Sequence, residues 1–429
     1  MTGARRAALR ILEGVREGLP FNAARDAAVQ DLDDRDRRLA HELAAGVLRR
    51  QTALDDALAP LVPRGWGAVD PSVQAILRLG AYQLAVLERV PPHAAVSTSV
   101  DLARESAGPR AAGFVNAVLR RLGRRPLEAP ATSGDPARDL ARRHSHPVWL
   151  VARWLARFGP AETEALLAWN DRPPDLVVQP AREELDALLA RWQDAGIAGC
   201  RAPYGAGIVL EHRSPTTLPG YQEGAFMVQD PAQALVARFA APPPDGIVFD
   251  ACAAPGGKTL ALGRGARHVV AAELDRVRAA RLTLNLKRAG SGRESVILSD
   301  ALQSPVRGAD LVLLDAPCLG TGTFARHPDA RWRARRGALG ALVRRQAGLL
   351  RAVATAVPPG ALLVYATCSL EPEENQVQID RFLEEHPGFR REPGSGVPAE
   401  LLSPAGDLTL LPQRHGMDGG FAARLRSIG

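Results

Sequence analysis

The sequence predicts an α/β protein whose mostly parallel sheet follows a helical region. From about residue 224 onwards, apolar segments alternate with segments of helical periodicity, which is typical of a parallel sheet covered by helices. One apolar segment, residues 311–314, is an unbroken run of Leu and Val, as expected for a strand buried on both faces. Before residue 125, apolar residues instead recur at helical spacing.

Residues 1–125 are predicted to form an all-helical domain. Asp70 is placed to cap a helix whose first turn contains Pro71. Residues 126–140 are rich in Pro, Gly, Ser, Thr and Ala, which indicates a linker. The helices of this domain are predicted at residues 5–15, 36–48, 72–87, 94–106 and 110–122.

Residues 141–223 are predicted to form a small α+β module. Its basic and aromatic residues are compatible with RNA binding. His144 and His146 lie close together in the sequence, but no further metal ligands lie near them, so we expect no metal site there. The elements of the module are predicted at residues 148–158 (helix), 176–179 (strand), 183–195 (helix) and 207–210 (strand).

Residues 224–429 are predicted to form the domain that contains the parallel sheet. Because open α/β sheets bind ligands at the carboxyl ends of their strands, we expect the functional site at that edge. Strands are predicted at residues 247–250, 268–273, 296–298, 310–314 and 361–365, with helices at 258–262, 276–289, 339–356 and 373–385.

Composition argues against a membrane protein and against a zinc or disulfide framework, and it suggests one kind of partner. No segment approaches the length of a membrane span, and the N-terminus lacks an apolar signal core, so we expect a cytoplasmic protein without membrane contact. The four cysteines lie far apart without a CxxC pair, which argues against a zinc site or a disulfide framework. A net charge of +7 suggests a polyanionic partner.

A glycine-containing loop, residues 250–259, follows the first strand of the predicted sheet. Its small residues allow a ligand to approach the backbone just before a helix N-terminus. The loop matches neither GxxxxGK[ST] nor GxGxxG, which weakens a dinucleotide interpretation. Lys258 and Lys287 are the two lysines among 54 basic residues, so Lys258 in this loop is a candidate for a specific role.

Acidic residues end the next two predicted strands. Glu273 lies at the end of the second strand, where a carboxylate can accept hydrogen bonds from both hydroxyls of a ribose. Asp300 follows the third strand and is placed to meet an adenine ring. Each alone is a common acid at a strand end, but their order along successive strands predicts a nucleoside site.

Two thiols follow the fourth and fifth strands. Asp315 and Cys318 come after the run 311–314, and Cys368 follows the fifth strand. Because adjacent strands lie about 5 Å apart, both thiols can reach one substrate. The alternatives are a strand-end Asp that caps a turn and cysteines that are buried and inert.

Two parts of the chain resemble known families. Residues 39–49, 76–84 and 113–120 resemble the helical RNA-binding domain of NusB, over about residues 4–125. Over residues 145–429 the chain resembles the RNA cytosine-C5 methyltransferase family, and together the two parts are similar to its bacterial Sun/RsmB branch. The motifs of this second resemblance are residues 226–231, 250–259, 315–318, 367–370, 372–375 and 418–421.

The resemblance implies a Rossmann-like domain that uses S-adenosyl-L-methionine to methylate C5 of a cytosine in small-subunit (16S) ribosomal RNA. It assigns Cys368 as the nucleophile that adds to C6, and Cys318 as the thiol that assists product release. Asp315 would hold the base, Lys258 would orient the loop and Asp315, and the protein is expected to act as a monomer without a metal. The donor would contact Cys252, Ala253, Ala254, Pro255, Gly256, Gly257, Lys258, Glu273, Asp300 and Asp315.

The chain departs from the family pattern at three positions. Leu319 stands where Ser is frequent, Glu273 where Asp is usual, and Gly420 where Phe is frequent. Glu273 is a longer but equivalent acceptor, whereas the other two put details of base or tail packing in doubt.

Several interpretations remain open at the level of sequence. The substrate could instead be transfer RNA or a protein, or the chain could be a non-catalytic RNA-binding or assembly protein. The missing GxGxxG disfavours a nicotinamide dehydrogenase. Basic residues at 331–336 are candidates to help extrude the target base, and those at 120–125 either contact phosphate or form a solvated helix end.

Overall fold

The computed structural model describes residues 2–123, 132–210 and 214–429. Its contacts divide the chain into two units. The first unit contains the chain up to Pro173 together with the segment Phe324–Ala334, and the second contains Pro174–Thr323 and Arg335–Gly429. The chain therefore leaves the second unit after Thr323 and returns to it at Arg335.

The first unit is helical in its described part. Asp70 accepts hydrogen bonds from the backbone N–H groups of Ser72 and Val73, which confirms the predicted N-cap before Pro71. Two of the predicted helices are joined at Gly108, whose φ of +85° and following proline produce a kink. The helices are α1 (Thr2–Arg16), α2 (Phe21–Ala28), α3 (Asp34–Arg49), α4 (Gln51–Leu58), α5 (Pro71–Ala85), α6 (Pro92–Leu122), α7 (Pro136–Arg143), α8 (Val148–Asp171) and α13 (Ala330–Arg333).

The predicted linker is partly helical. Residues 136–140 form the start of α7, because the Asp135 carboxylate accepts the N–H groups of Ala137 and Arg138 and caps the helix. Residues 126–131 of the predicted linker, and Arg124 and Arg125 of the basic cluster, lie outside the described residues.

Arg331 is a buried ion of the first unit, with an exposed fraction of 0%. Its guanidinium donates hydrogen bonds to the carbonyl oxygens of Asn170 at 2.7 Å and His144 at 3.2 Å, and to the Asp171 carboxylate at 3.1 Å. Burial lowers the pKa of Arg331 to about 10, and the charge of Asp171 opposes this shift. The expectation that Arg331 contacts RNA is wrong, because its side chain is enclosed by protein.

The second unit begins with a small antiparallel sheet in the order β2–β3–β1–β4. One face of this sheet packs against Trp192 of α9 (Leu185–Asp194), whose ring meets Phe226 edge-on at 5.2 Å. Strands β2 and β4 are only three residues long and were not predicted from the sequence. The strands are β1 (Leu176–Pro180), β2 (Gly199–Arg201), β3 (Ile208–Leu210) and β4 (Phe226–Val228).

The large sheet has the order β10–β12–β9–β8–β5–β6–β7, with β11 paired to β12. Pairing is parallel from β9 to β7, and strand order reverses between β8 and β5, which makes this edge a topological switch point. Its strands are β5 (Ile247–Asp250), β6 (His268–Glu273), β7 (Glu294–Leu298), β8 (Leu311–Asp315), β9 (Leu362–Thr367), β10 (Phe389–Arg391), β11 (Leu408–Leu410) and β12 (Gly420–Ser427).

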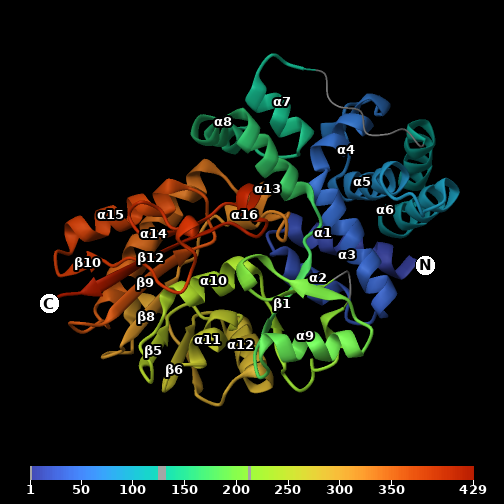
Figure 1. The fold of residues 1–429 in the computed structure, drawn as a ribbon. Helices are drawn as coiled ribbons and strands as arrows, with labels where there is room; N and C mark the ends of the chain where they lie inside the picture. The colour runs from blue at the N-terminus through green and yellow to red at the C-terminus, as the bar shows by residue number, and fades with distance from the viewer. Residues whose placement is uncertain (1, 124–131, 211–213) are drawn as a thin grey trace. The chain divides into compact units, whose positions relative to one another are not determined.

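Helices cover both faces of the large sheet (Figure 1). Leu311 and Leu313 pack on the side of α10 and α11, whereas Val312 and Leu314 pack on the side of α14 and α15. This two-sided burial explains the unbroken apolar run, because successive side chains of a strand point to opposite faces. The helices are α10 (Pro231–Ala240), α11 (Gly257–Gly263), α12 (Arg276–Ala289), α14 (Arg336–Ala354) and α15 (Gln376–Glu385).

Replacement of the buried arginine is expected to destabilise the first unit. Arg331→Met should lower its free energy of unfolding by about 3–5 kcal/mol, because the partners of the guanidinium stay behind without a donor. Denaturant unfolding followed by circular dichroism measures this change. Arg335→Met, at an exposed arginine, is the matched control and should change stability little; equal effects of the two substitutions would contradict the buried role of Arg331.

Candidate active site

Two thiols meet at the switch-point edge of the large sheet. Cys318 lies three residues beyond the end of β8, and Cys368 directly follows β9. Their Sγ atoms are 3.2 Å apart. The structure thus brings together two cysteines that are fifty residues apart in the sequence.

The surroundings of Cys318 favour its protonated form. A hydrogen bond with Cys368 raises the pKa of the Cys318 thiol well above its usual value, as do burial and the nearby negative charges of Cys368, Glu374 and Asp315. The raised pKa favours Cys318 as the donor in the contact between the two sulfur atoms.

Lys258 lies beside Asp315. Its ammonium nitrogen is 2.7 Å from the Asp315 carboxylate and also donates a hydrogen bond to the Gln233 side chain. Lys258 is almost fully buried in the first turn of α11, whereas Asp315 remains partly exposed. This arrangement fixes one carboxylate oxygen of Asp315 near the thiols and leaves the group accessible to a ligand.

The loop before α11 is packed tightly against protein. A Cβ atom at Gly256 would lie 2.9 Å from Leu282, and one at Gly257 would lie 2.7 Å from Gln229. Both contacts are with the movable ends of side chains, but Gly256 also has a φ of +108°, which L side chains rarely adopt, so its backbone conformation favours glycine whether or not a ligand approaches the loop. In the same loop, burial and the carboxylates of Asp315, Asp250 and Glu273 raise the pKa of Cys252 to about 12, so this thiol is not a nucleophile at neutral pH.

The two strand-end acids are positioned by their own turns. Glu273 accepts the N–H groups of Leu274 and Asp275 through one oxygen. Its other oxygen forms an ion pair with exposed Arg278 at 3.2 Å but accepts no hydrogen bond among the described residues. Asp300 accepts the N–H of Leu302 at 3.0 Å and so caps a short 3₁₀ turn, which is the structural role that the sequence left open for such acids.

Three residues that the sequence did not single out surround the thiols. Gln346 of α14 and Glu374, in the 3₁₀ turn Pro372–Glu374, contact the chain beside Cys318. Asn375 contacts the chain beside Cys368. For Glu374 and Asn375 the signal was their place in the motif at 372–375, to which no role had been assigned, whereas Gln346 lies outside every motif. Most of their partners are backbone groups that a sequence does not reveal.

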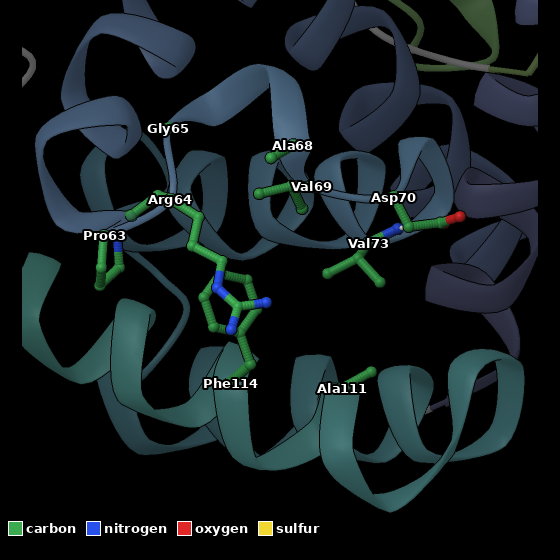
Figure 2. Close-up of a pocket in the computed structure, with 10 residues that line it drawn as sticks. Pro63, Arg64, Gly65, Ala68, Val69, Asp70, Val73, Ala111 and Phe114 are labelled. Carbon is green, nitrogen blue, oxygen red and sulfur yellow. Dashed lines mark hydrogen bonds between the residues drawn. The ribbon is translucent and has the colours of Figure 1, made fainter.

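A separate cavity of about 420 Å³ lies in the first unit, between the segment 62–70 and α6 (Figure 2). Its lining is mostly apolar and includes Val69, Val73 and Phe114, with Arg64 at its wall. None of the predicted catalytic or donor-binding residues lines this cavity. It is therefore not part of the site at the strand ends.

The described residues provide no cluster of three or more His, Cys, Asp or Glu side chains suited to a metal. His144 and His146 have other partners: the ring of His144 is 2.9 Å from the Asp171 carboxylate, and that of His146 contacts the Asn170 amide at 3.1 Å. Burial lowers the pKa of His146 well below its usual value.

Among the helices of the described residues, none has the length and apolar character needed to span a membrane.

The doubly wound sheet, its strand-end acids and its loop before α11 define a Rossmann-like methyltransferase fold. Three family models match successive parts of the chain: the NusB family at residues 2–124, the ferredoxin-like domain of RsmF/B-like methyltransferases at 146–217, and the 16S rRNA methyltransferase RsmB/F at 237–426.

Curated relatives match over nearly the full length. The probable ribosomal RNA small subunit methyltransferase B of Synechocystis is 36% identical over 99% of this chain and 100% of the relative. The ribosomal RNA small subunit methyltransferase B of Pseudomonas putida is 38% identical over 99% and 98%. The chain therefore belongs to the RsmB/F family of rRNA methyltransferases, which confirms the resemblance found in the sequence.

Solved structures support the fold. The crystal structure of PH0851 covers 100% of this chain and 99% of its own, with a TM-score of 0.84 at 24% identity. The structure of NSun6 from Pyrococcus horikoshii covers 65% of this chain and 97% of its own, with a TM-score of 0.58 at 19% identity. At these identities the likeness concerns the fold alone.

The raised pKa of Cys318 predicts a specific pattern of thiol reactivity. Because thiolate is the reactive form, alkylation of Cys318 by iodoacetamide should be slow at neutral pH and should increase only at high pH. Cys368→Ala removes the hydrogen bond and the negative charge that raise this pKa, so Cys318 should then react faster at a given pH. Peptide mass spectrometry across a pH series measures both rates, with exposed Cys200 as the internal control. A Cys318 rate that is unchanged by Cys368→Ala would contradict the electrostatic coupling.

Proposed function

We propose that this protein transfers a methyl group from S-adenosyl-L-methionine to C5 of a cytosine in 16S rRNA, through a covalent adduct between a cysteine and C6. The observation that supports this most strongly is the pair of thiols at 3.2 Å beside the Lys258-bound carboxylate of Asp315. Relatives that match almost the whole chain are named small subunit methyltransferase B.

The residues at the strand ends fit a nucleoside-containing methyl donor. The Glu273 oxygen that accepts no hydrogen bond among the described residues is free to accept from ribose hydroxyls. The loop Cys252–Gly257, Lys258, Asp300 and Asp315 would complete the donor site. When bound, the donor supplies an electrophilic methyl group.

Cys368 acts as the nucleophile in this proposal. C5 of cytosine is a weak nucleophile, and addition of the Cys368 thiolate to C6 gives C5 the electron density that it needs to accept the methyl group. Cys318, which stays protonated, stabilises that thiolate by donating a hydrogen bond. Asp315 holds the N3 and N4 edge of the base and stabilises the adduct, in a position kept by Lys258.

Cys318 acts at product release. Once the Cys368 sulfur is bonded to C6, it no longer carries the negative charge that raises the pKa of Cys318. Cys318, which is partly exposed, can then release its proton to water, and the resulting thiolate accepts the proton from C5. The electron pair of that C–H bond re-forms the C5–C6 double bond. The C6–S bond breaks in the same elimination and returns the Cys368 thiolate.

The parts of the chain before the large sheet are assigned to RNA binding. We assign residues 1–125 to a NusB-like RNA-binding domain and 141–223 to a small RNA-binding module, and 224–429 to the methyltransferase domain. The positive net charge of +7 is consistent with contacts to phosphate. The protein would act as a monomer.

The two thiols should give opposite results when each is removed. Cys368→Ala should abolish methyl transfer and form no protein–RNA adduct. Cys318→Ala should form the adduct but release it slowly, so a covalent species accumulates. Denaturing gel electrophoresis with labelled RNA measures the adduct, and an adduct that needs Cys318 but survives Cys368→Ala would reverse the assignment.

Glu273 should determine donor affinity. Glu273→Ala removes an acceptor for the ribose hydroxyls and should weaken binding of S-adenosyl-L-homocysteine about tenfold or more, the usual effect of losing a hydrogen bond to a charged group. Isothermal titration calorimetry measures this, with Glu384→Gln at an exposed position as the control. Unchanged affinity would exclude Glu273 from the donor site.

The RNA substrate is tested by a separate assay. Labelled methyl donor would be supplied with naked 16S rRNA, with small ribosomal subunits and with transfer RNA. Label in 5-methylcytosine of 16S rRNA is expected, in naked RNA or in subunits. Label confined to transfer RNA would show that the chemistry is right but that the assigned substrate is wrong.

A further inference from the structure

We propose that Glu374, Asn375 and Gln346 are positioning residues that together hold the two thiols at their working distance. We call these three residues the thiol clamp. The inference deepens the proposed function, because it rests on the roles given there to Cys318 and Cys368. The geometry of the clamp itself is independent of those roles.

Glu374 and Gln346 hold the chain on both sides of Cys318. One carboxylate oxygen of Glu374 accepts the backbone N–H of Leu319 at 2.9 Å. The side-chain amide of Gln346 donates to the carbonyl oxygen of Pro317 at 3.0 Å and to that same Glu374 oxygen at 2.9 Å. The residues before and after Cys318 are thus tied to one interconnected pair of side chains.

Asn375 holds the chain on both sides of Cys368 in a similar way. Its amide nitrogen donates to the carbonyl oxygen of Ser369 at 2.8 Å, and its amide oxygen accepts from the Thr367 hydroxyl at 2.5 Å. The Thr367 hydroxyl in turn accepts the backbone N–H of Ser369 at 3.2 Å. Two consecutive residues, Glu374 and Asn375, therefore reach the neighbours of both cysteines.

The clamp is anchored to the sheet. The Tyr365 hydroxyl, on β9, donates to the backbone carbonyl oxygen of Glu374 at 2.7 Å. This bond joins the turn at 372–375 to the strand that ends just before Cys368. A displacement of the turn would consequently move the Cys318 loop relative to β9.

The burial of the clamp suggests a role beyond packing. Glu374 and Gln346 have exposed fractions of 0%, and Asn375 is nearly as enclosed. Burial raises the pKa of Glu374, which is the signature of a carboxyl group held in an unfavourable medium. A buried carboxyl group is expensive compared with an apolar residue of similar size, unless its hydrogen bonds fulfil a specific purpose. Here those bonds end on the backbone beside a reactive thiol.

The first test measures thiol spacing without RNA or methyl donor. The full-length protein is treated with dibromobimane, which links two thiols only when they are close, and the Cys318–Cys368 product is quantified by peptide mass spectrometry. Glu374→Ala and Asn375→Ala should lower the yield about tenfold, because each removes hydrogen bonds next to a thiol. Glu374→Gln keeps an acceptor oxygen and should retain the yield. Glu373→Ala removes the adjacent, less buried carboxylate and is the matched control.

The second test measures the catalytic consequence. A misplacement of about 1 Å can lower a rate about a hundredfold, so Glu374→Ala should slow adduct release and accumulate protein–RNA adduct, as Cys318→Ala does. Glu374→Gln should restore release. A purely structural role predicts instead that adduct formation and release fall together, in proportion to the loss of folded protein measured by thermal unfolding.

The outcomes separate the clamp from the proposed function. If folded Glu374→Ala and Asn375→Ala proteins gave the same yield of Cys318–Cys368 product as the wild-type protein, the proposed positioning role of the thiol clamp would be wrong, whatever their activity. Loss of cross-linking in these variants, together with an absence of methyl transfer by the wild-type protein on every RNA, would support the clamp and refute the proposed function.

Discussion

The parallel pairing of β8 with β9 is the constraint on which the site depends. In its register Asp315 lies opposite Ala366, so both chains leave the sheet at nearly the same level. Cys318 is three residues beyond Asp315 and Cys368 is two beyond Ala366, which brings the two thiols within 3.2 Å of each other. A shift of register by one residue would send each side chain of β8 to the opposite buried face, where it would no longer fit its neighbours, and would move Cys318 along the edge relative to Cys368. The burial of the sheet on both faces and the spacing of the thiols therefore depend on the same hydrogen-bond ladder.

Electrostatics then distinguish two residues of the same type. Cys318 has the sulfur of Cys368 as its neighbour and the carboxyl groups of Glu374 and Asp315 nearby, and all of these favour its protonated form. Asp315 is paired with Lys258, one of only two lysines in the chain. A lysine provides a compact charge at the end of a flexible stem, and here that charge holds one oxygen of Asp315 while leaving the carboxylate partly exposed. The site thus combines a neutral thiol, a second thiol that can accept its hydrogen bond, and an acid in a defined orientation.

The segment Phe324–Ala334 illustrates how chain order and spatial order differ. It follows the Cys318 loop in sequence, yet it belongs to the first unit and contributes the buried ion Arg331 to it. From the sequence, Arg331, Trp332 and Arg333 form a basic and aromatic patch suited to RNA. In the structure Arg331 satisfies backbone carbonyl groups and Asp171 instead, and the Trp332 indole donates to the carbonyl oxygen of Leu48. Composition alone does not distinguish a solvated arginine from one that is enclosed.

The sequence by itself determined most of the large sheet and the identity of its polar strand ends. Continuous apolar runs such as residues 311–314 and strand–helix alternation are local patterns, and β5, β6 and α12 have the bounds that these patterns predict. The antiparallel strands β10, β11 and β12 were missed, since their stability comes from pairing with distant strands rather than from a local pattern. Only the tertiary structure decided the distance between the thiols, the surroundings that raise the pKa of Cys318, and the contacts of Glu374, Gln346 and Asn375. These properties depend on hydrogen bonds and charges between residues that are far apart in the chain. They could not be predicted from the sequence, because the identity of a side chain does not specify which backbone groups it will contact in the folded protein.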